Sequence, residues 1–352
     1  MMKNFKIAIF YSGNGPTHSG NWTGPWVEYC KRHSLVYQIV DPTDLNIIQK
    51  AKTFDVCLWH FSGYNYTEMQ LAPSILHSLE HIGKLVFPNF NDSWHFDDKI
   101  AQMYLLQNID APIPQSYVFY SNSNIQDFVR GNPEFPLIAK LKNGSGSHNV
   151  KMIQSSKQLF DYSKTMFSKG FSSSPSLIYK STSNIRSAKS LKTMVNRAKR
   201  IPEFLRTRRK ALQFPKEKGY VYLQEFIPND GFDLKVVVVG DKLSFIGRST
   251  RKGEFRASGG GSLFYDKKFI SKELISVAFE VSDRLGVQCM GYDFVIDNRN
   301  NKPIIIEMSY GFSHSALLDA QGYFDRKGNW HNEPLNAPEE VLQNLIKKRA
   351  QT

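Results

Sequence analysis

The 352-residue sequence has few cysteines and lacks any long apolar run. Its three cysteines, Cys30, Cys57 and Cys289, are scattered, which excludes a disulfide framework and shows no metal-ligand spacing. No run of about 18 apolar residues is present, so no membrane-spanning helix is expected. The apolar run at Ile7–Tyr11 is short and ends in polar residues, so it indicates a first strand rather than a signal peptide. A cytoplasmic protein is the expectation.

The composition nevertheless predicts a globular chain. Hydrophobic residues make up 41% and aromatic residues 13%, enough to fill a core, and the length suits two or three packed lobes. The net charge of +13 is concentrated, because ten Lys or Arg and one acid lie between Arg186 and Lys210. The high isoelectric point is therefore mainly a property of one segment.

This basic segment, residues 185–212, allows two interpretations. Apolar residues at helical spacing with basic residues opposite predict a helix that contacts the anionic inner face of a membrane. A solvated insertion explains the same residues. Aromatic residues do not alternate with the basic ones, so no nucleic-acid partner is expected. The oligomeric state cannot be read from the sequence.

The first 95 residues alternate strand and helix patterns, which implies an open parallel sheet. The expected strands are Ile7–Tyr11, Leu35–Val40, Val56–His60 and Leu85–Pro88, and the expected helices are Gly24–His33, Leu45–Lys52 and Met69–Gly83. No Gly-x-Gly-x-x-Gly follows the first strand, so no dinucleotide site is expected.

The remaining chain mixes strands and helices less regularly. A helix is expected at Asp97–Asn108, and a Ser-rich and then basic stretch runs from Ser168 to Lys218. The expected strands are Leu137–Leu141, Val150–Ile153, Tyr220–Phe226, Leu234–Val239, Lys242–Arg248, Gln288–Ile296 and Pro303–Met308; further helices are expected at Lys272–Leu285 and Ala337–Arg349.

Three groups of residues could carry chemistry. Lys140 lies on a buried strand and precedes the small residues Gly144, Ser145, Gly146 and Ser147, whose backbone N–H groups could surround a phosphate. An ordinary hairpin accounts for the same residues.

The second group is a pair of acids. Asp293 and Glu307 lie on two strands joined by a turn at Asn298–Asn301, so their carboxylates should be neighbours. Such hard oxygen ligands suit magnesium, whereas an acid paired with an arginine is the alternative.

The third group consists of Gln224, Glu225, Phe226 and Ile227, which precede Asp233. An open strand end there could pair with adenine and Asp233 with ribose, although a hairpin with surface charges is as consistent.

Taken in order, these motifs resemble those of ATP-grasp enzymes. The resemblance covers about residues 85–315 and also includes Asp98-Lys99, Ala111–Pro114 and Arg256–Gly260. It implies a mixed α/β chain: a pre-ATP-grasp, Rossmann-like parallel-sheet domain at 1–95, a two-lobed α+β ATP-grasp domain at 96–315, and a C-terminal segment at 316–352. Within the second domain it implies a Gly/Ser-loop lobe at about 110–170, a basic insertion at about 171–218 and a metal lobe at about 219–315.

The resemblance also implies residue roles. Lys99, Lys140 and the loop from Gly144 to Ser147 would contact ATP, residues 224–227 would meet adenine, and Asp233 would bind ribose. Asp293, Glu307 and Ser309 would hold Mg²⁺, with Mn²⁺ as the alternative ion. Arg256, Lys235 and Arg248 would be the catalytic cations. Two positions depart from the family, since Ser309 stands where asparagine is common and Lys235 where arginine is common.

The implied reaction is ATP-dependent ligation of a carboxylate to an amine through an acyl phosphate. The run Glu307–Gly311 and the sequence Gly328–His331 are similar to ATP-grasp proteins of surface-polysaccharide gene clusters, which favours a uronic-acid or nucleotide-sugar substrate. A kinase of the same fold and an amino-acid or peptide ligase are the alternatives. His314 and His331 either line the acceptor site or are ordinary polar histidines.

Overall fold

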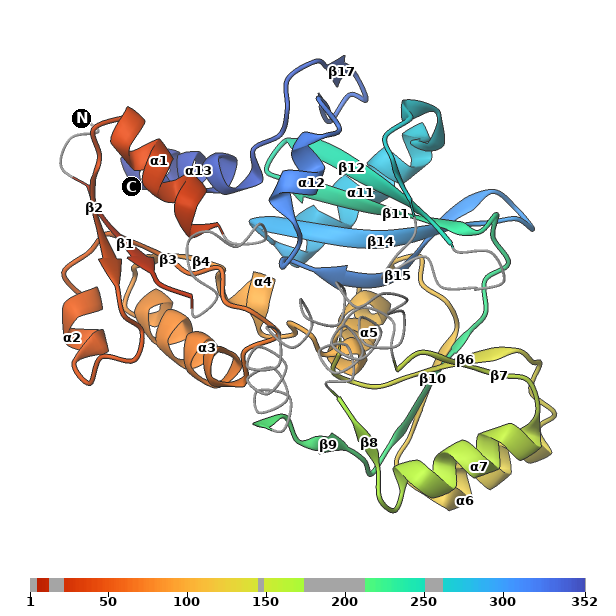
Figure 1. Cartoon of the computed structure of the whole chain (residues 1–352). Helices are drawn as coiled ribbons and strands as arrows, with labels where there is room; N and C mark the ends of the chain where they lie inside the picture. The colour runs from red at the N-terminus through yellow and green to blue at the C-terminus, as the bar shows by residue number, and fades with distance from the viewer. Residues whose placement is uncertain (1–4, 13–21, 145–148, 174–212, 251–261, 352) are drawn as a thin grey trace, which may run out of the picture. The chain divides into compact units, whose positions relative to one another are not determined.

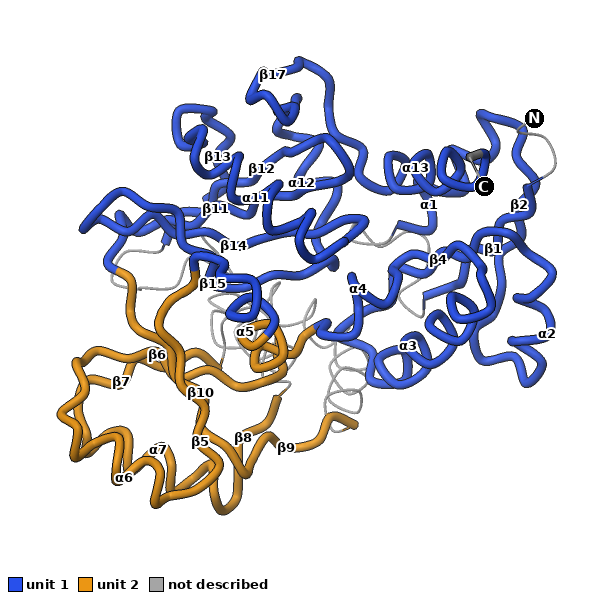
Figure 2. Tube along the Cα trace, turned by 180° about the vertical axis from the view of Figure 1, so that it is seen from behind, with its two compact units in different colours: residues 1–96, 105–112, 228–352 blue, residues 97–104, 113–227 orange. Residues whose placement is uncertain are grey.

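The structure is a computed structural model that describes residues 5–12, 22–144, 149–173, 213–250 and 262–351 (Figure 1). The chain forms two compact units (Figure 2). Unit 1 contains Met1–Phe96, Leu105–Pro112 and Pro228–Thr352, and unit 2 contains Asp97–Tyr104 and Ile113–Ile227. The sequence predicted domain boundaries at residues 95 and 315. The two units divide the chain differently, because Pro228–Thr352 belongs to the same unit as the N-terminal residues.

The N-terminal part of unit 1 is the expected open parallel sheet. Its order is β2-β1-β3-β4 and all pairs are parallel. The strands are β1 (Lys6–Phe10), β2 (Val36–Val40), β3 (Val56–Leu58) and β4 (Leu85–Phe87), and the helices are α1 (Thr23–Arg32), α2 (Ile47–Ala51), α3 (Tyr66–His81) and the short α4 (Phe90–Ser93). Residues 7–10 of β1 are wholly buried, as expected for a central strand covered on both faces.

The second part of unit 1 is a seven-stranded antiparallel sheet. Its order is β15-β14-β11-β12-β16-β17, and β13 pairs with β12. The strands are β11 (Phe232–Val239), β12 (Lys242–Ser249), β13 (Leu263–Phe264), β14 (Cys289–Asp297), β15 (Lys302–Ser309), β16 (Tyr323–Phe324) and β17 (Trp330–His331). The helical elements are η2 (Lys267–Phe269), α11 (Lys272–Leu285), α12 (His314–Leu318) and α13 (Ala337–Gln351).

Local signals explain why α11 begins and ends where the sequence predicts. The Ser271 hydroxyl accepts a hydrogen bond from the Leu274 N–H, which caps the first turn. Gly286 then adopts a left-handed conformation with φ of 63°, which terminates the helix. The apolar face of α11, including Leu274, Ala278 and Leu285, is buried, and the helix contacts β11 and β15.

Unit 2 contains a four-stranded antiparallel sheet of order β5-β10-β6-β7 and a two-stranded ribbon. The strands are β5 (Ser116–Phe119), β6 (Leu137–Lys140), β7 (Lys151–Ile153), β8 (Phe171–Ser172), β9 (Lys216–Glu217) and β10 (Val221–Glu225); the helices are α6 (Asn122–Arg130) and α7 (Ser156–Met166), and α5 (Lys99–Asn108) begins here and ends in unit 1. Leu223 at the middle of β10 is wholly buried and belongs to the core of this unit.

Several elements have no counterpart in the sequence prediction. They are β5, β8, β9, β13, β16, β17, α4, α6, α7, α12 and η2. Helix α6 shows why, because Ile125 is its only wholly buried residue and most of its other side chains are polar. Its apolar residues Ile125, Phe128 and Val129 do have helical spacing, but the segment has only nine residues and was not recognised as a helix. No helix among the described residues is long and apolar enough to cross a membrane, and the basic segment 185–212 lies entirely outside them.

Candidate active site

Five charged side chains lie on one face of the seven-stranded sheet in unit 1. They are Asp233 and Lys235 of β11, Arg248 of β12, Asp293 of β14 and Glu307 of β15. The register pairs Asp233 with Arg248, Lys235 with Asp293, and Asp293 with Glu307. Directly opposed residues of antiparallel strands share a face, as do residues two apart on one strand. The expectation that Asp293 and Glu307 are neighbours is therefore confirmed.

Asp293 is at the centre of this charged face. Its Oδ1 lies 2.5 Å from the Lys235 Nζ, and its Oδ2 lies 2.9 Å from the Arg248 Nη2. Arg248 also donates from Nε to the Asp233 Oδ1 at 2.5 Å. The side chains of Asp293 and Asp233 are 11% and 5% exposed, so these charges are held together away from water. An acid paired with an arginine, the alternative to a metal ligand, is thus present.

The two aspartates differ in proton affinity although they share one arginine. Burial raises the pKa of Asp233 to about 6, and Arg248 offsets this only in part. Burial also acts to raise the pKa of Asp293, but Arg248 and Lys235 together outweigh it and hold that pKa at about 2. Asp293 is therefore ionised at neutral pH, as a metal-binding carboxylate must be.

The donor set fits a hard divalent cation under one condition. Three acids against two basic groups leave this face with one net negative charge. No group of three or more His, Cys, Asp or Glu among the described residues could hold a metal, so phosphate and water must supply the other ligands. Because Lys235 and Arg248 contact the Asp293 oxygens, a metal there requires these cations to turn towards an anion such as phosphate.

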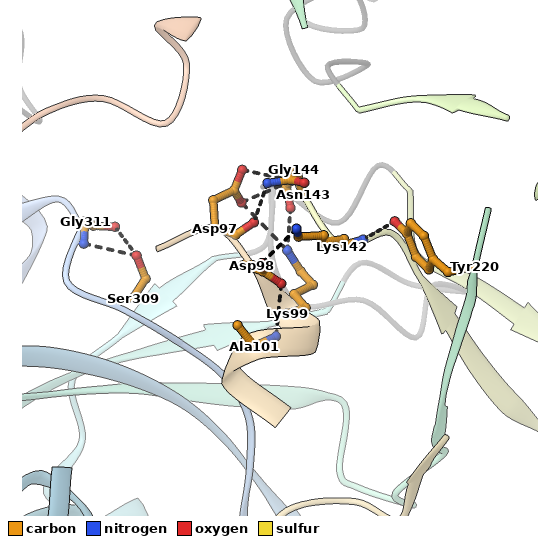
Figure 3. Close-up of polar contacts among 10 residues, drawn as sticks. All are labelled: Asp97, Asp98, Lys99, Ala101, Lys142, Asn143, Gly144, Tyr220, Ser309 and Gly311. Atoms are coloured by element: carbon orange, nitrogen blue, oxygen red, sulfur yellow. Dashed lines mark hydrogen bonds and ion pairs between the residues drawn. The ribbon is translucent and has the colours of Figure 1, made fainter. Parts of the chain in front are cut away.

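Ser309 ends strand β15, on the same strand as Glu307. Its hydroxyl donates to the Gly311 carbonyl at 3.2 Å and accepts from the Gly311 N–H at 3.0 Å (Figure 3). These bonds turn the chain locally after the strand. The hydroxyl has one more lone pair, so its predicted contact with a metal stays a prediction.

In unit 2, an aspartate that sequence reasoning missed anchors the first residues of the Gly/Ser loop. The Asp97 carboxylate accepts the Gly144 N–H with both oxygens, at 3.1 and 3.0 Å (Figure 3). Its carbonyl accepts from the Asn143 side-chain amide at 3.0 Å. Both Asp97 and Gly144 have positive φ, of 56° and 116°. The sequence did not indicate a role for Asp97, because nothing in it places residue 97 beside residue 144.

The predicted phosphate lysines are both buried in unit 2. Lys99 donates from Nζ to the Gly144 carbonyl at 2.6 Å and lies 3.9 Å from Asp97, so the structure brings it to the base of the loop (Figure 3). Lys140 ends strand β6 and is 7% exposed. The contact of Lys140 with a phosphate stays a prediction. Ser145, Gly146, Ser147 and Arg256 lie outside the described residues.

A second tether reaches the loop from the strand side. The Tyr220 hydroxyl accepts from the Lys142 N–H at 2.6 Å and donates to the Glu217 carboxylate at 2.8 Å. Lys142 also forms an ion pair with Asp98 at 3.0 Å (Figure 3). Residues 142–144 are thus fixed from both sides by side chains of unit 2.

The proposed adenine segment begins inside the sheet rather than at its edge. Gln224 and Glu225 belong to β10, which pairs with β5 on one side and β6 on the other. The Glu225 N–H already donates to the Gln115 carbonyl at 2.8 Å. The expectation of an open strand edge is therefore wrong for these two residues, because a central strand has no unpaired edge. Phe226 and Ile227 follow the strand and stay candidates for the contact.

The histidines of the C-terminal segment have separate settings within unit 1. The His331 Nε2 lies 3.1 Å from the partly exposed Asp325 carboxylate, within the β16–β17 hairpin. His314 begins α12 and is only partly exposed. The contact of His331 is consistent with an ordinary surface role.

These features define the ATP-grasp class of fold. Residues 203–315 match the model of the RimK-like ATP-grasp domain. The D-alanine–D-alanine ligase from Bacillus anthracis, also solved with ATP, has a TM-score of 0.61 at 12% identity over 99% of each chain. A RimK domain protein ATP-grasp from Sphaerobacter thermophilus has a TM-score of 0.52 at 15% identity, over 88% of this chain and 93% of that one.

The curated sequence match is local. A tetrahydromethanopterin:alpha-L-glutamate ligase from Methanosarcina acetivorans is 30% identical over 142 residues, which span 37% of this chain and 42% of that ligase. The match to solved structures shows the fold, and the sequence match to the RimK-like ATP-grasp domain covers residues 203–315.

Proposed function

We propose that this protein is an ATP-dependent ligase that joins a carboxylate to an amine through an acyl phosphate. The observation that carries the proposal is the charged face of the seven-stranded sheet. There Asp293 and Glu307 are directly opposed, with Lys235 and Arg248 beside Asp293. Paired carboxylates suit a divalent cation, and the adjacent cations suit phosphate oxygens. The face lies within the residues that match a RimK-like ATP-grasp domain.

The predicted nucleotide contacts are part of this proposal. Lys99, Lys140 and the N–H groups of the Gly/Ser loop would bind phosphates, whereas Phe226 and Ile227 would meet adenine and Asp233 ribose. Asp293 and Glu307, with Ser309 as a third donor, would hold Mg²⁺ or Mn²⁺. When bound, the cation would neutralise phosphate charge.

The chemistry then requires positioning more than covalent participation by the enzyme. A substrate carboxylate oxygen attacks the γ-phosphorus, the bond between γ-phosphorus and the bridging oxygen breaks, and ADP leaves. An amine then attacks the acyl carbon and loses a proton, while phosphate leaves with its electron pair. Lys235 and Arg248 would stabilise the charge on the transferred phosphoryl group, with Arg256 as the third predicted cation.

Our proposal for the identity of the substrate goes further than the comparisons with known proteins do. We favour an amino acid or other amine joined to a uronic-acid or nucleotide-sugar carboxylate in surface-polysaccharide synthesis, because of the likeness carried by Glu307–Gly311 and Gly328–His331. A free amino-acid or peptide carboxylate is the second candidate, and the glutamate ligase named above favours it. A cytoplasmic site of action, with the basic segment at the inner membrane face, suits lipid-linked glycans.

The test uses hydroxylamine as a small amine that does not require the natural acceptor. ATP, Mg²⁺ and single carboxylates, including glucuronate and L-glutamate, are incubated with the protein, and products are separated by mass spectrometry. The expected products are a hydroxamate, ADP and phosphate. Asp293→Asn and Glu307→Gln should abolish them, whereas the control Asp127→Ala, on the exposed face of α6, should not. AMP and pyrophosphate with a reactive carboxylate would refute the acyl-phosphate route.

The same experiment separates a kinase of this fold from a ligase. A kinase would yield ADP and a stable phosphorylated substrate without consuming hydroxylamine. Failure of the wild-type protein to bind ATP by calorimetry would refute both activities.

A further inference from the structure

The parallel sheet of unit 1 has a topological switch point between β1 and β3. Strand β1 lies between β2 and β3, so the connections from β1 and from β2 lead to opposite sides of the sheet. In open parallel sheets, ligands bind outside the carboxyl ends of strands at such points. His60 follows the end of β3 by two residues, which places it at this edge.

Three buried ring nitrogens near this edge have no hydrogen-bond partner among the described residues. They are the Trp22 Nε1, the His60 Nε2 and the His314 Nδ1. Trp22 is wholly buried, and its ring stacks on His60 with centroids 4.7 Å apart and planes 8° apart. Phe312, two residues before His314, meets the Trp22 ring edge-on with centroids 5.3 Å apart, and burial and then repulsion from His314 lower the pKa of His60 to about 3. His60 and His314 are partly exposed as residues, whereas the three unpartnered nitrogens are themselves buried.

Two neighbouring polar groups in the same unit have hydrogen-bond partners. The Trp26 Nε1 donates to the Pro338 carbonyl at 2.8 Å, and the Tyr310 hydroxyl donates to the Phe61 carbonyl at 3.2 Å. The Trp59 Nε1 is also buried without a partner. A single unpartnered nitrogen is therefore no evidence for a binding site. The proposal depends on three such rings, from distant parts of the chain, lying in one group.

We propose that Trp22, His60 and His314 bind the carboxylate group of a small-molecule substrate, an inference that rests on the proposed ligase function. An indole N–H only donates, so its partner must be an acceptor. A carboxylate presents two acceptor oxygens and can take hydrogen bonds from the indole and from the imidazoles. The aromatic rings of Phe87 and Phe312, which contact Trp22, provide apolar walls that strengthen such bonds.

Chain connectivity relates this group to the charged face. Strand β15 carries Glu307 and ends at Ser309, and α12 begins at His314, within the same unit. A substrate held at His314 is therefore held by the segment that directly follows the predicted metal strand.

The test measures carboxylate binding directly in the full chain. Acetate, L-glutamate and glucuronate are titrated into wild type, Trp22→Phe, His60→Phe and the control Trp59→Phe by calorimetry. Phenylalanine keeps an aromatic ring and removes the nitrogen. Wild type and the control should bind at least one carboxylate saturably, and the other two variants should bind it at least tenfold more weakly, as expected for losing one charge-assisted hydrogen bond.

A second measurement on wild type does not depend on variants folding. Histidine Cε1 resonances are followed by NMR during the titration, and two of them should shift with the same affinity as the calorimetry. Equal affinity in wild type and Trp22→Phe, or no saturable binding of any of the three carboxylates, would overturn the proposal. The affinity for ATP should be the same in wild type and in the variants. If wild type does not bind ATP, the ligase function is refuted, independently of the result for the carboxylate site.

Discussion

Asp97 offers the sharpest prediction about the nucleotide site, because its carboxylate holds Gly144 while its backbone is itself in the left-handed region. Asp97→Gly removes the carboxylate and tolerates the φ of 56°. Hydrogen bonds to a charged group contribute about 1.5–3 kcal/mol each. If most of one such bond pre-orders the loop for phosphate, ATP affinity should fall about 10-fold to 100-fold.

The assay is calorimetric titration with ATP and Mg²⁺, paired with a thermal melt of each variant. Asp97→Asn should lose less affinity than Asp97→Gly, because it keeps an acceptor oxygen and tolerates positive φ. Asp97→Ala should be the most damaging, since alanine in the left-handed region costs about 1–2 kcal/mol more. The control is Asp127→Ala, since Asp127 is 67% exposed and pairs with Arg130 on the surface of the same unit.

One result would refute the reasoning about Asp97. If Asp97→Gly bound ATP as tightly as wild type, the carboxylate would contribute nothing to nucleotide binding, even if the melting temperature fell. Loss of affinity in Asp127→Ala as well would point to a general charge effect instead.

Three further predictions concern stability and charge. Burial raises the pKa of Asp92 from 3.8 to about 7, so the folded protein holds this proton more tightly than the unfolded chain does. As the pH rises through that interval, the free energy of unfolding should fall by up to about 1.4 kcal/mol per pH unit. Urea titrations at several pH values should show this slope in wild type and a flatter one in Asp92→Asn. Arg248→Met should cost about 3–5 kcal/mol, because Asp233 and Asp293 lose a buried partner, and NMR titration should show the pKa of Asp293 above its present value of about 2. Leu223→Ala should cost about 2–5 kcal/mol in urea unfolding, since this side chain is wholly buried in the core of unit 2; a cost under about 1 kcal/mol would contradict that packing.

The sequence by itself determined the strands with strong apolar periodicity and the order of the motifs. Helix α11 was predicted with its observed bounds, because Ser271 and Gly286 mark its ends and its apolar face is regular. The short turn predicted that Asp293 and Glu307 would be neighbours, but their direct opposition depends on a β-bulge between Asp293 and Phe294 that shifts the register by one residue. These features depend on interactions between residues close in the chain.

Only the tertiary structure decided which distant groups meet. Asp97 and Gly144 lie 47 residues apart, and nothing local indicates that one holds the other. Trp22, His60 and His314 likewise come together through packing within unit 1. Tertiary pairing also placed Glu225 in a central strand, where its N–H is already used. Long-range contacts of this kind depend on how the sheets and helices pack, whereas periodicity and turn signals record only the conformation of each segment.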